Sequence, residues 1–489
     1  MIHTGLLDPG FVAVLESSFV AITIGFGIYF GLYQLTYLLI VVRAIGSIAE
    51  ERRWASDELL SGTFASPLTP GVSVLVPAHN ESAGSIACVE SLLRLQYPKV
   101  QVIVVDDGST DGTSEVLREH FPMTLTDEEP LSPIEVQGEI ESVHRFEGHD
   151  ALLVRKRSVG RRADAVNAAL RFARHELVCM IDGDSILSPT ALLRVVQPFI
   201  DDPTVVATGG IVRPANGVTL IEAEVDRVEM PRRFIERIQV LEYLRAFLVG
   251  RAGWSAIKGL LIISGAFGVF RRDTLVELGG LDAESLAEDA ELVVAAHRHH
   301  RTEREPYRIV FVADPVCWTE VPATWSAVSR QRKRWAQGLG ELLRGCRDMM
   351  LRPRYGSLGL VTLPYFWLFE QWGAPLVGVA MIVTALAGLF GFIPWLAIGL
   401  ALLISYLVAV ATSLLAIAIE LGATSDYRTG RSMRLLIGTA LLEPILFYLP
   451  HALWRSIGLW RAIRSTPSEW GAQQRAGFAQ RAEAPGQAA

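Results

Sequence analysis

Two stretches of the chain contain no charged residue and are long enough to cross a membrane. Residues 17–42 form a run of about 26 such positions, and a helix of roughly 20 apolar residues spans a bilayer core. Residues 371–419 form a second run of about 49, which at about 1.5 Å per helical residue exceeds one crossing. The pattern predicts one span in the first run and two in the second, with a turn near residues 391–394.

Arginine residues flank these runs on one predicted side of the membrane. The first run is followed by arginines, and the second has arginines before and after it: Arg43, Arg52, Arg53, Arg352, Arg354, Arg428, Arg431 and Arg434. Cytoplasmic loops carry an excess of Lys and Arg. We therefore expect residues 1–16 outside the cytoplasm, residues 17–43 as a transmembrane helix, two more such helices in residues 371–419, and the central region in the cytoplasm.

A third apolar segment, residues 435–456, differs because it contains Glu443 and two prolines and has arginine on both flanks. A re-entrant helix packed against the other spans would accommodate the carboxylate and the broken backbone. A third C-terminal span is the alternative. Residues 322–370 predict amphipathic interfacial helices. Residues 457–489 form a tail that is cytoplasmic in the re-entrant arrangement.

Residues 71–321 show short β-branched runs separated by helical stretches. The strand-like runs are residues 72–76, 102–105, 177–181, 205–208 and 309–312. Strands that alternate with helices predict an α/β fold with a mostly parallel sheet and helices on both faces. In such sheets ligands bind at the carboxyl ends of the strands. The first three runs end in polar residues, which places several carboxylates at one edge of the expected sheet.

Composition supports a membrane protein with a globular domain. Half of the residues are hydrophobic, 20% are charged and the mean hydropathy is +0.32, which is too apolar for an ordinary soluble enzyme. A net charge of −7 without a basic patch excludes nucleic acid as a partner. The four cysteines are far apart and have no zinc-type spacing, so a reducing compartment is expected.

An ordered series of motifs resembles the family-2 glycosyltransferases, in particular the processive membrane synthases of cellulose, hyaluronan, chitin oligosaccharides and poly-N-acetylglucosamine. The motifs are Pro77-x-x-Asn80-Glu81, Asp106-Asp107-Gly108-Ser109, residues 160–170 with Asn167, Asp182-x-Asp184, Ser264-Gly265-Ala266-Phe267, Glu288-Asp289 and Gln331-x-x-Arg334-Trp335. A two-Asp spacing alone is common by chance. The full set in this order at strand ends is specific.

The resemblance implies a GT-A (Rossmann-like) domain over residues 71–321, preceded by a linker at residues 44–70. It implies Asp289 as the general base that takes a proton from the acceptor hydroxyl, with inversion at the donor carbon. Asp182 and Asp184 are the implied ligands of a divalent metal, Mg²⁺ or Mn²⁺, which neutralises the charge of the nucleoside-diphosphate leaving group.

The implied donor-binding residues are His79, Glu81, Asp107, Arg162, Asp182, Gln331, Arg334 and Trp335. His79 stands where the family often has an aromatic residue, and a plain loop residue is the alternative. Arg162 stands where the family usually has Lys; positive charge is retained, but the fork geometry differs. Trp335 offers an apolar face for a sugar ring. The alternative for its helix is an interfacial anchor.

A segment near the end, with Trp470 and Arg475, resembles the one that closes over the nucleotide in hyaluronan synthases, although its spacing departs from that pattern. We treat it as a hypothetical gate. It would require a cytoplasmic C-terminus.

Together these features predict a multi-pass enzyme of a bacterial plasma (inner) membrane with a cytoplasmic catalytic domain. It would transfer sugar from a UDP-sugar to a growing β-linked polysaccharide and pass the polymer outward; accessory secretion subunits are compatible with this role. One alternative is a non-processive transferase that glycosylates a lipid carrier. The other is a catalytically silent membrane subunit that binds nucleotide.

Overall fold

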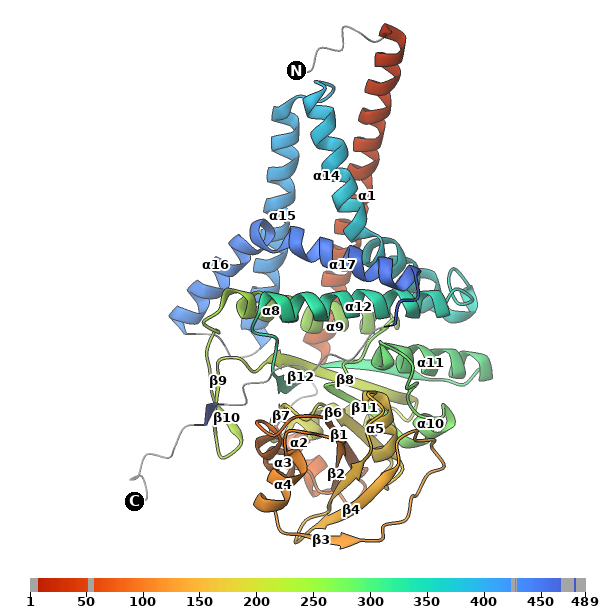
Figure 1. The fold of residues 1–489 in the computed structure, drawn as a ribbon, viewed down its shortest axis with the longest axis vertical. Helices are drawn as coiled ribbons and strands as arrows, with labels where there is room; N and C mark the ends of the chain where they lie inside the picture. The colour runs from red at the N-terminus through yellow and green to blue at the C-terminus, as the bar shows by residue number, and fades with distance from the viewer. Residues whose placement is uncertain (1–7, 52–56, 424–426, 428, 468–478, 481–489) are drawn as a thin grey trace.

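The computed structural model describes residues 8–51, 57–423, 427, 429–467, 479 and 480. A sheet-containing domain lies at one end, and long helices project from the other, with a layer of helices between them (Figure 1). The predicted α/β class is confirmed.

A ten-stranded sheet forms the centre of the domain, in the order β3-β4-β5-β2-β1-β6-β11-β8-β12-β7. Its strands are β1 (Val72–Ala78), β2 (Val100–Asp107), β3 (Met123–Thr126), β4 (Ile140–Phe146), β5 (Ala151–Lys156), β6 (Leu177–Ile181), β7 (Ser185–Leu187), β8 (Val205–Pro214), β11 (Phe267–Arg271) and β12 (Arg308–Thr319). Most strands run in one direction; β4, β7 and β11 oppose them. All five runs predicted as strands are strands.

Both faces of the sheet are buried. On β1, Leu75 packs into one hydrophobic cluster while Val74 and Val76 pack into another on the opposite face. The covering helices are α2 (Asp57–Ala65), α3 (Ser85–Leu93), α4 (Thr113–His120), α5 (Arg162–Leu170), α6 (Ala191–Val195), α7 (Gln197–Asp201), α10 (Arg272–Glu277) and α11 (Glu288–Glu303). Burial on both faces explains why these strands read as continuous apolar runs. A small second sheet contains β9 (Val218–Ile221), β10 (Glu224–Val228) and β13 (Ala479–Gln480).

Three long apolar helices project away from the sheet: α1 (Pro9–Glu51), α14 (Gly373–Leu389) and α15 (Trp395–Ala423) (Figure 1). Two helices, α1 and α15, are long and apolar enough to cross a membrane, and the number rises to four if each of two bent helix pairs counts as one span. Apolar side chains such as Ile28 and Leu402 are exposed along them. Between α14 and α15 the chain turns at Gly391, whose φ is 78°.

A layer of shorter helices separates the sheet from these projecting helices (Figure 1). It contains α8 (Phe234–Tyr243), the π-helical turn η1 (Leu244–Gly250), α9 (Arg251–Ala256), α12 (Trp325–Gly345), η2 (Pro353–Tyr355), η3 (Leu358–Thr362), α13 (Leu363–Tyr365), η4 (Phe366–Gln371), α16 (Gly430–Leu446) and α17 (Tyr448–Ile463). Helices α16 and α17 are bent by 58° at their junction. Helix α17 packs closely along α12, since a Cβ at Gly458 would collide with the Lys333 carbonyl oxygen.

Buried ion pairs join this layer to its neighbours. Arg213 of β8 pairs with Glu420 of α15, and both side chains are 1% exposed. Arg245 of η1 pairs with Glu443 of α16 at 2.5 Å. Charged groups in apolar surroundings are costly unless they are paired. The carboxylate in the third apolar segment is thus compensated by the helix layer.

Candidate active site

The loops that follow β1, β2 and β6 lie side by side at one edge of the sheet. These strands are parallel neighbours, and Ala78 at the end of β1 is in register with Asp106 at the end of β2. Parallel strands deliver their carboxyl ends to the same edge. The polar residues after these strands therefore meet, although they are distant in sequence.

The loops after β1 and β2 are bonded to each other. His79 Nδ1 lies 2.7 Å from the Asp107 carbonyl oxygen, which makes this nitrogen the donor. The Asp107 carboxylate accepts from Lys156 Nζ at 2.5 Å and from Ser158 Oγ at 3.0 Å. Lys156 is fully buried and also pairs with Asp164 at 2.8 Å. Lys156 and Ser158 thus fix the Asp107 carboxylate, although neither residue belongs to a predicted motif.

The thiol of Cys88 lies 3.8 Å from the Asp182 carbonyl oxygen, near the acidic motifs. Burial raises the pKa of Cys88, and the negative charges of Asp184, Glu81 and Asp182 raise it further. Glu81 and Asp184 are buried, and Asp184 Oδ1 accepts from Thr319 Oγ1 at 3.1 Å. Carboxylate oxygens are the donors that Mg²⁺ and Mn²⁺ prefer. Asp182 and Asp184 offer donors of this type, although Arg162 already pairs with Asp182.

Arg162 bridges two of the acidic motifs. Its Nε donates to Asp182 Oδ1 at 2.9 Å, its Nη1 to Glu288 Oε1 at 3.3 Å and its Nη2 to the Gly265 carbonyl at 2.8 Å. Burial alone would lower the pKa of Arg162, but the charges of Asp182 and Glu288 outweigh it and raise the pKa. A Cβ at Gly265 would lie 3.1 Å from Nη1, so glycine leaves room for the guanidinium.

Asp289 lies in the first turn of α11, beside Glu288. Its Oδ2 accepts from the Gly265 amide at 3.2 Å, and its Oδ1 accepts from the Ala290 amide at 2.8 Å. Burial is the main cause that raises the pKa of Glu288; Arg162 opposes it and Asp289 adds to it. The backbone bonds fix the orientation of the Asp289 carboxylate.

Helix α12 brings Gln331, Arg334 and Trp335 to this region. Burial lowers the pKa of Arg334, and the charges of Glu288, Asp289 and Asp182 oppose that shift, which places Arg334 within their field. Gln331 accepts from the neighbouring Arg332 at 3.0 Å. The Arg332 guanidinium also lies 4.2 Å from the centre of the Trp335 ring. Trp335 is 42% exposed, so Arg332 leaves much of its surface accessible.

Sequence reasoning missed Arg251, at the start of α9. Its guanidinium lies 3.6 Å from the centre of the Phe247 ring, and Phe247 stacks on Tyr243 with ring centres 4.6 Å apart. Burial lowers the pKa of Arg251 to about 10, against the opposing charges of Asp289 and Tyr243. Within the described part of the chain, nothing accepts a hydrogen bond from its buried Nη1 atom. The sequence signal that could have identified Arg251 is a charged residue within an apolar helical segment.

Contacts join His79 to Asp107, and Arg162 to Asp182 and Glu288. Arg334 lies within the field of Asp182, Glu288 and Asp289, and Gln331 and Trp335 share helix α12 with it. Lys156, Thr319 and Arg251 join them without having been predicted. Trp470 and Arg475, the predicted gate, lie outside the described residues.

Two family models match the chain. Residues 73–254 match the glycosyl transferase family 2 model, and residues 177–412 match the glycosyl transferase family group 2 model. A poly-β-1,6-N-acetyl-D-glucosamine synthase of Staphylococcus epidermidis is 26% identical over 301 residues, which cover 62% of this chain and 61% of that protein. The synthase of Staphylococcus aureus strain COL is 26% identical over 304 residues, with the same coverage. The chain thus spans about three fifths of these curated relatives.

Two solved structures also match, at lower sequence identity. A mannosyltransferase from Pyrobaculum calidifontis, in complex with GDP-Man and Mn²⁺, is 19% identical with a TM-score of 0.48; the match covers 89% of this chain and all of that one. Residues 1–349 of Staphylococcus aureus TarS, in complex with UDP-GlcNAc, are 13% identical with a TM-score of 0.38, over 76% of this chain and 91% of that one.

Proposed function

Because this chain is a family-2 glycosyltransferase, we propose that it transfers sugar from a UDP-sugar to a growing β-linked polysaccharide, with inversion and with a divalent metal. The observation that carries the proposal is the bridge that Arg162 makes between Asp182 and Glu288, next to Asp289. It joins the residues suited to the diphosphate and those suited to the acceptor in one site.

Asp182 and Asp184 are the residues that would hold the metal. When bound, a divalent cation stabilises the negative charge that develops on the diphosphate leaving group. Arg162 already donates to Asp182 Oδ1, so it competes with the metal for that oxygen. Arg334 supplies a second positive charge within the field of Asp182, Glu288 and Asp289. Its planar guanidinium suits phosphate oxygens.

Asp289 accepts the proton of the attacking acceptor hydroxyl. Its carboxylate is fixed by two backbone amides, so it needs little reorganisation before proton transfer. The attack on the donor carbon opposite the leaving diphosphate inverts its configuration. Glu288 contributes by holding Arg162 in place.

The uridine lies over the loops after β1 and β2. Glu81 and Asp107 supply acceptors for the base and ribose, and the His79 ring packs beside them. Lys156 and Ser158 support this assignment, because they fix the Asp107 carboxylate before the nucleotide binds. The two curated relatives are named for a polymer of N-acetylglucosamine. UDP-N-acetylglucosamine is therefore the first donor to test.

Arg251 and Trp335 position the acceptor. Arg251 has a buried donor atom without a partner among the described residues, and a buried donor that stays unsatisfied costs roughly 1–3 kcal/mol. A sugar hydroxyl of the acceptor would satisfy it. The exposed part of the Trp335 ring supplies an apolar surface for the same chain.

The helices beyond α12 provide the route for secretion. A polar polymer crosses lipid only along a protein-lined path. Polar side chains are present among the membrane-facing helices: Tyr29 of α1 donates to the Leu368 carbonyl at 2.6 Å, and Arg455 pairs with Glu370 at 3.0 Å. The path would lie next to the site, in a protein embedded in a bacterial plasma membrane.

The test is incubation of the detergent-purified protein with labelled UDP-sugars and Mg²⁺ or Mn²⁺, followed by sizing of the product. We expect a long polymer from one donor, and loss of synthesis with a chelator. A short, lipid-extractable product would instead indicate a transferase that glycosylates a lipid carrier. Absence of UDP release with every donor would indicate a silent nucleotide-binding subunit.

A further inference from the structure

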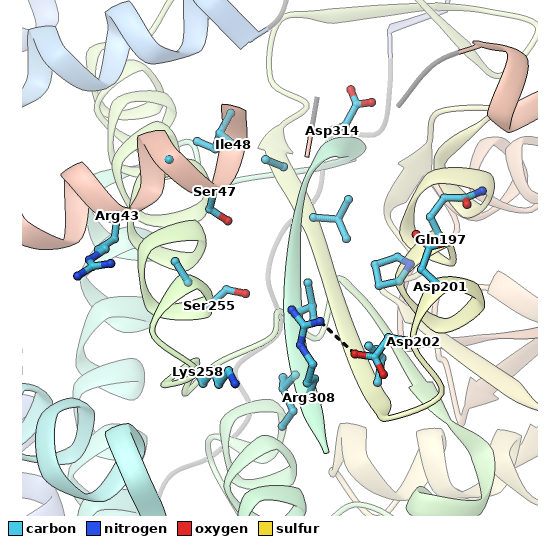
Figure 2. A pocket seen from close by; sticks show the side chains of 18 of the residues that line it. Arg43, Ser47, Ile48, Gln197, Asp201, Asp202, Ser255, Lys258, Arg308 and Asp314 are labelled. Atoms are coloured by element: carbon cyan, nitrogen blue, oxygen red, sulfur yellow. Dashed lines mark hydrogen bonds and ion pairs between the residues drawn. The ribbon is translucent and has the colours of Figure 1, made fainter. Parts of the chain in front are cut away.

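A cavity of about 1370 Å³ lies at the edge of the sheet opposite the candidate active site. Its walls include Asp202, just before β8, and Arg308, the first residue of β12 (Figure 2). The active-site loops instead follow the carboxyl ends of the strands, so the two sites are distinct. Helices α1 and α9 form the wall that faces β12 across this cavity (Figure 2).

The cavity is bounded by the ends of both helices that are long enough to span a membrane. Leu39 and Val42 come from the last third of α1, and Gly422 lies next to the last residue of α15. Val42 is also the last residue of the first uncharged run. The apolar lining therefore comes from the ends of these two apolar helices that lie nearest the sheet.

The positively charged side chains of the cavity lining outnumber the negatively charged ones. Asp202 pairs with Arg308 at 3.0 Å, and Asp314 pairs with Arg194. Arg43 and Lys258 are exposed, and the structure gives neither of them an ion pair within the described ranges.

The other charged groups of the lining are Arg301 and Asp201. Arg301 donates to the Tyr307 hydroxyl at 3.1 Å. Among the described residues, Asp201 is the one acid of the lining without an ion pair. Arg43, Lys258 and Arg301 therefore outnumber it.

Lys258 occupies a position where the backbone favours glycine. Its φ is 57°, and it follows the C-terminal end of α9, where the Gly259 amide donates to the Trp254 carbonyl at 2.9 Å. Glycine usually fills this left-handed position after a helix, because a side chain there costs about 1 kcal/mol. A lysine at this position places a positive charge at the C-terminal end of α9, facing the cavity.

We propose that this cavity binds the phosphate group of an anionic membrane lipid. Arg43 and Lys258 contact the phosphate, and Ser255 donates from its hydroxyl, whose oxygen already accepts the Phe311 amide at 2.9 Å. The acyl chains lie along Leu39 and Val42. A free phosphate would contact the cations but would leave the apolar lining uncovered. We therefore assign the phosphate to a lipid of the bilayer.

The test uses the full chain in nanodiscs of phosphatidylcholine, with or without phosphatidylglycerol. We expect phosphatidylglycerol to raise the Tm and to remain bound in native mass spectrometry. Each juxtamembrane cation is worth about fivefold in affinity for anionic lipid, so a double variant should lose roughly 25-fold. The variant is Arg43→Gln with Lys258→Gly. The glycine relieves the left-handed turn, so the variant should fold in phosphatidylcholine as well as the unaltered protein does.

Arg157→Gln is the matched control, because Arg157 is exposed and distant in the fold, in a surface pair with Glu139. It should keep the full response to phosphatidylglycerol. The proposal is overturned if phosphatidylglycerol does not stabilise the unaltered protein, or if the double variant responds as strongly. It is also overturned if excess inorganic phosphate in phosphatidylcholine discs gives the same rise in Tm, since the ligand would then be a soluble anion.

Discussion

Asp289→Asn tests the assignment of the general base most directly. Asparagine has the shape of aspartate and keeps one oxygen, so it can still accept from either the Gly265 or the Ala290 amide. One of the two backbone bonds is lost, which costs about 1 kcal/mol of folding stability. The fold and the donor site should therefore survive the change.

The effect on catalysis should be much larger. A positioned general base contributes roughly 10²- to 10⁴-fold, which corresponds to about 3–5 kcal/mol of activation free energy. The side-chain amide that replaces the carboxylate cannot take the proton of the acceptor hydroxyl. We expect kcat to fall by that factor while UDP binds with nearly unchanged affinity.

The assay follows UDP release at saturating UDP-N-acetylglucosamine, with UDP affinity measured by calorimetry. Glu303→Gln is the control, since it makes the same carboxylate-to-amide change at the exposed far end of α11. It should leave both quantities unaltered. A kcat for Asp289→Asn within tenfold of the unaltered enzyme would refute the assignment. Equal losses of kcat and UDP affinity would indicate a structural role instead.

Three further perturbations follow from buried charges. Arg162→Lys should lower kcat by about 10- to 100-fold, measured by UDP release, because one ammonium cannot hold Asp182, Glu288 and the Gly265 carbonyl together; an unchanged rate would contradict this. Arg213→Met should cost about 3–5 kcal/mol of stability, seen as a lower Tm, because it leaves Glu420 charged and buried; adding Glu420→Met should restore part of it. Burial lowers the pKa of His297 to about 4. As the pH drops, His297 is protonated in the unfolded chain before it is protonated in the folded protein. The free energy of unfolding should therefore fall by roughly 3 kcal/mol between about pH 6.5 and pH 4. His297→Gln should flatten the profile of Tm against pH in that window, and an unchanged slope would assign the effect to other groups.

The arrangement of the acidic motifs could be predicted from the sequence, because it follows from one rule. Parallel strands bring their carboxyl ends to one edge, so Asp107 and Asp182 had to lie at the same edge once the strands were recognised. The strand order β2-β1-β6, which the sequence does not reveal, brings them close together. The partners of these residues could not be predicted. Lys156 reaches Asp107 from the last position of β5, and nothing in its local sequence marks it as buried.

The length of α1 is a second feature that the sequence could not predict. Hydropathy marks residues 17–42, whereas the helix extends over Pro9–Glu51. Beyond residue 42 the helix packs against the domain, because Ala44 and Ile48 belong to its buried hydrophobic cluster. A pattern of apolar residues reports burial in lipid or protein, but it does not report how far a helix continues along a domain that only the tertiary fold places beside it.

The segment from α8 through η1 to α9 links the membrane helices to the reaction centre. Glu242 pairs with Arg332 of α12 at 2.6 Å, Arg245 pairs with Glu443 of α16, and Arg251 lies within the field of Asp289. An α-helix advances about 100° per residue, and a π-helical turn adds a residue that resets this phase. The turn η1 lies between Glu242 and Arg251, so it decides which of these side chains face α12, α16 and the candidate active site. One continuous helical segment therefore contacts α12 through Glu242 and α16 through Arg245, and it carries Arg251 next to Asp289.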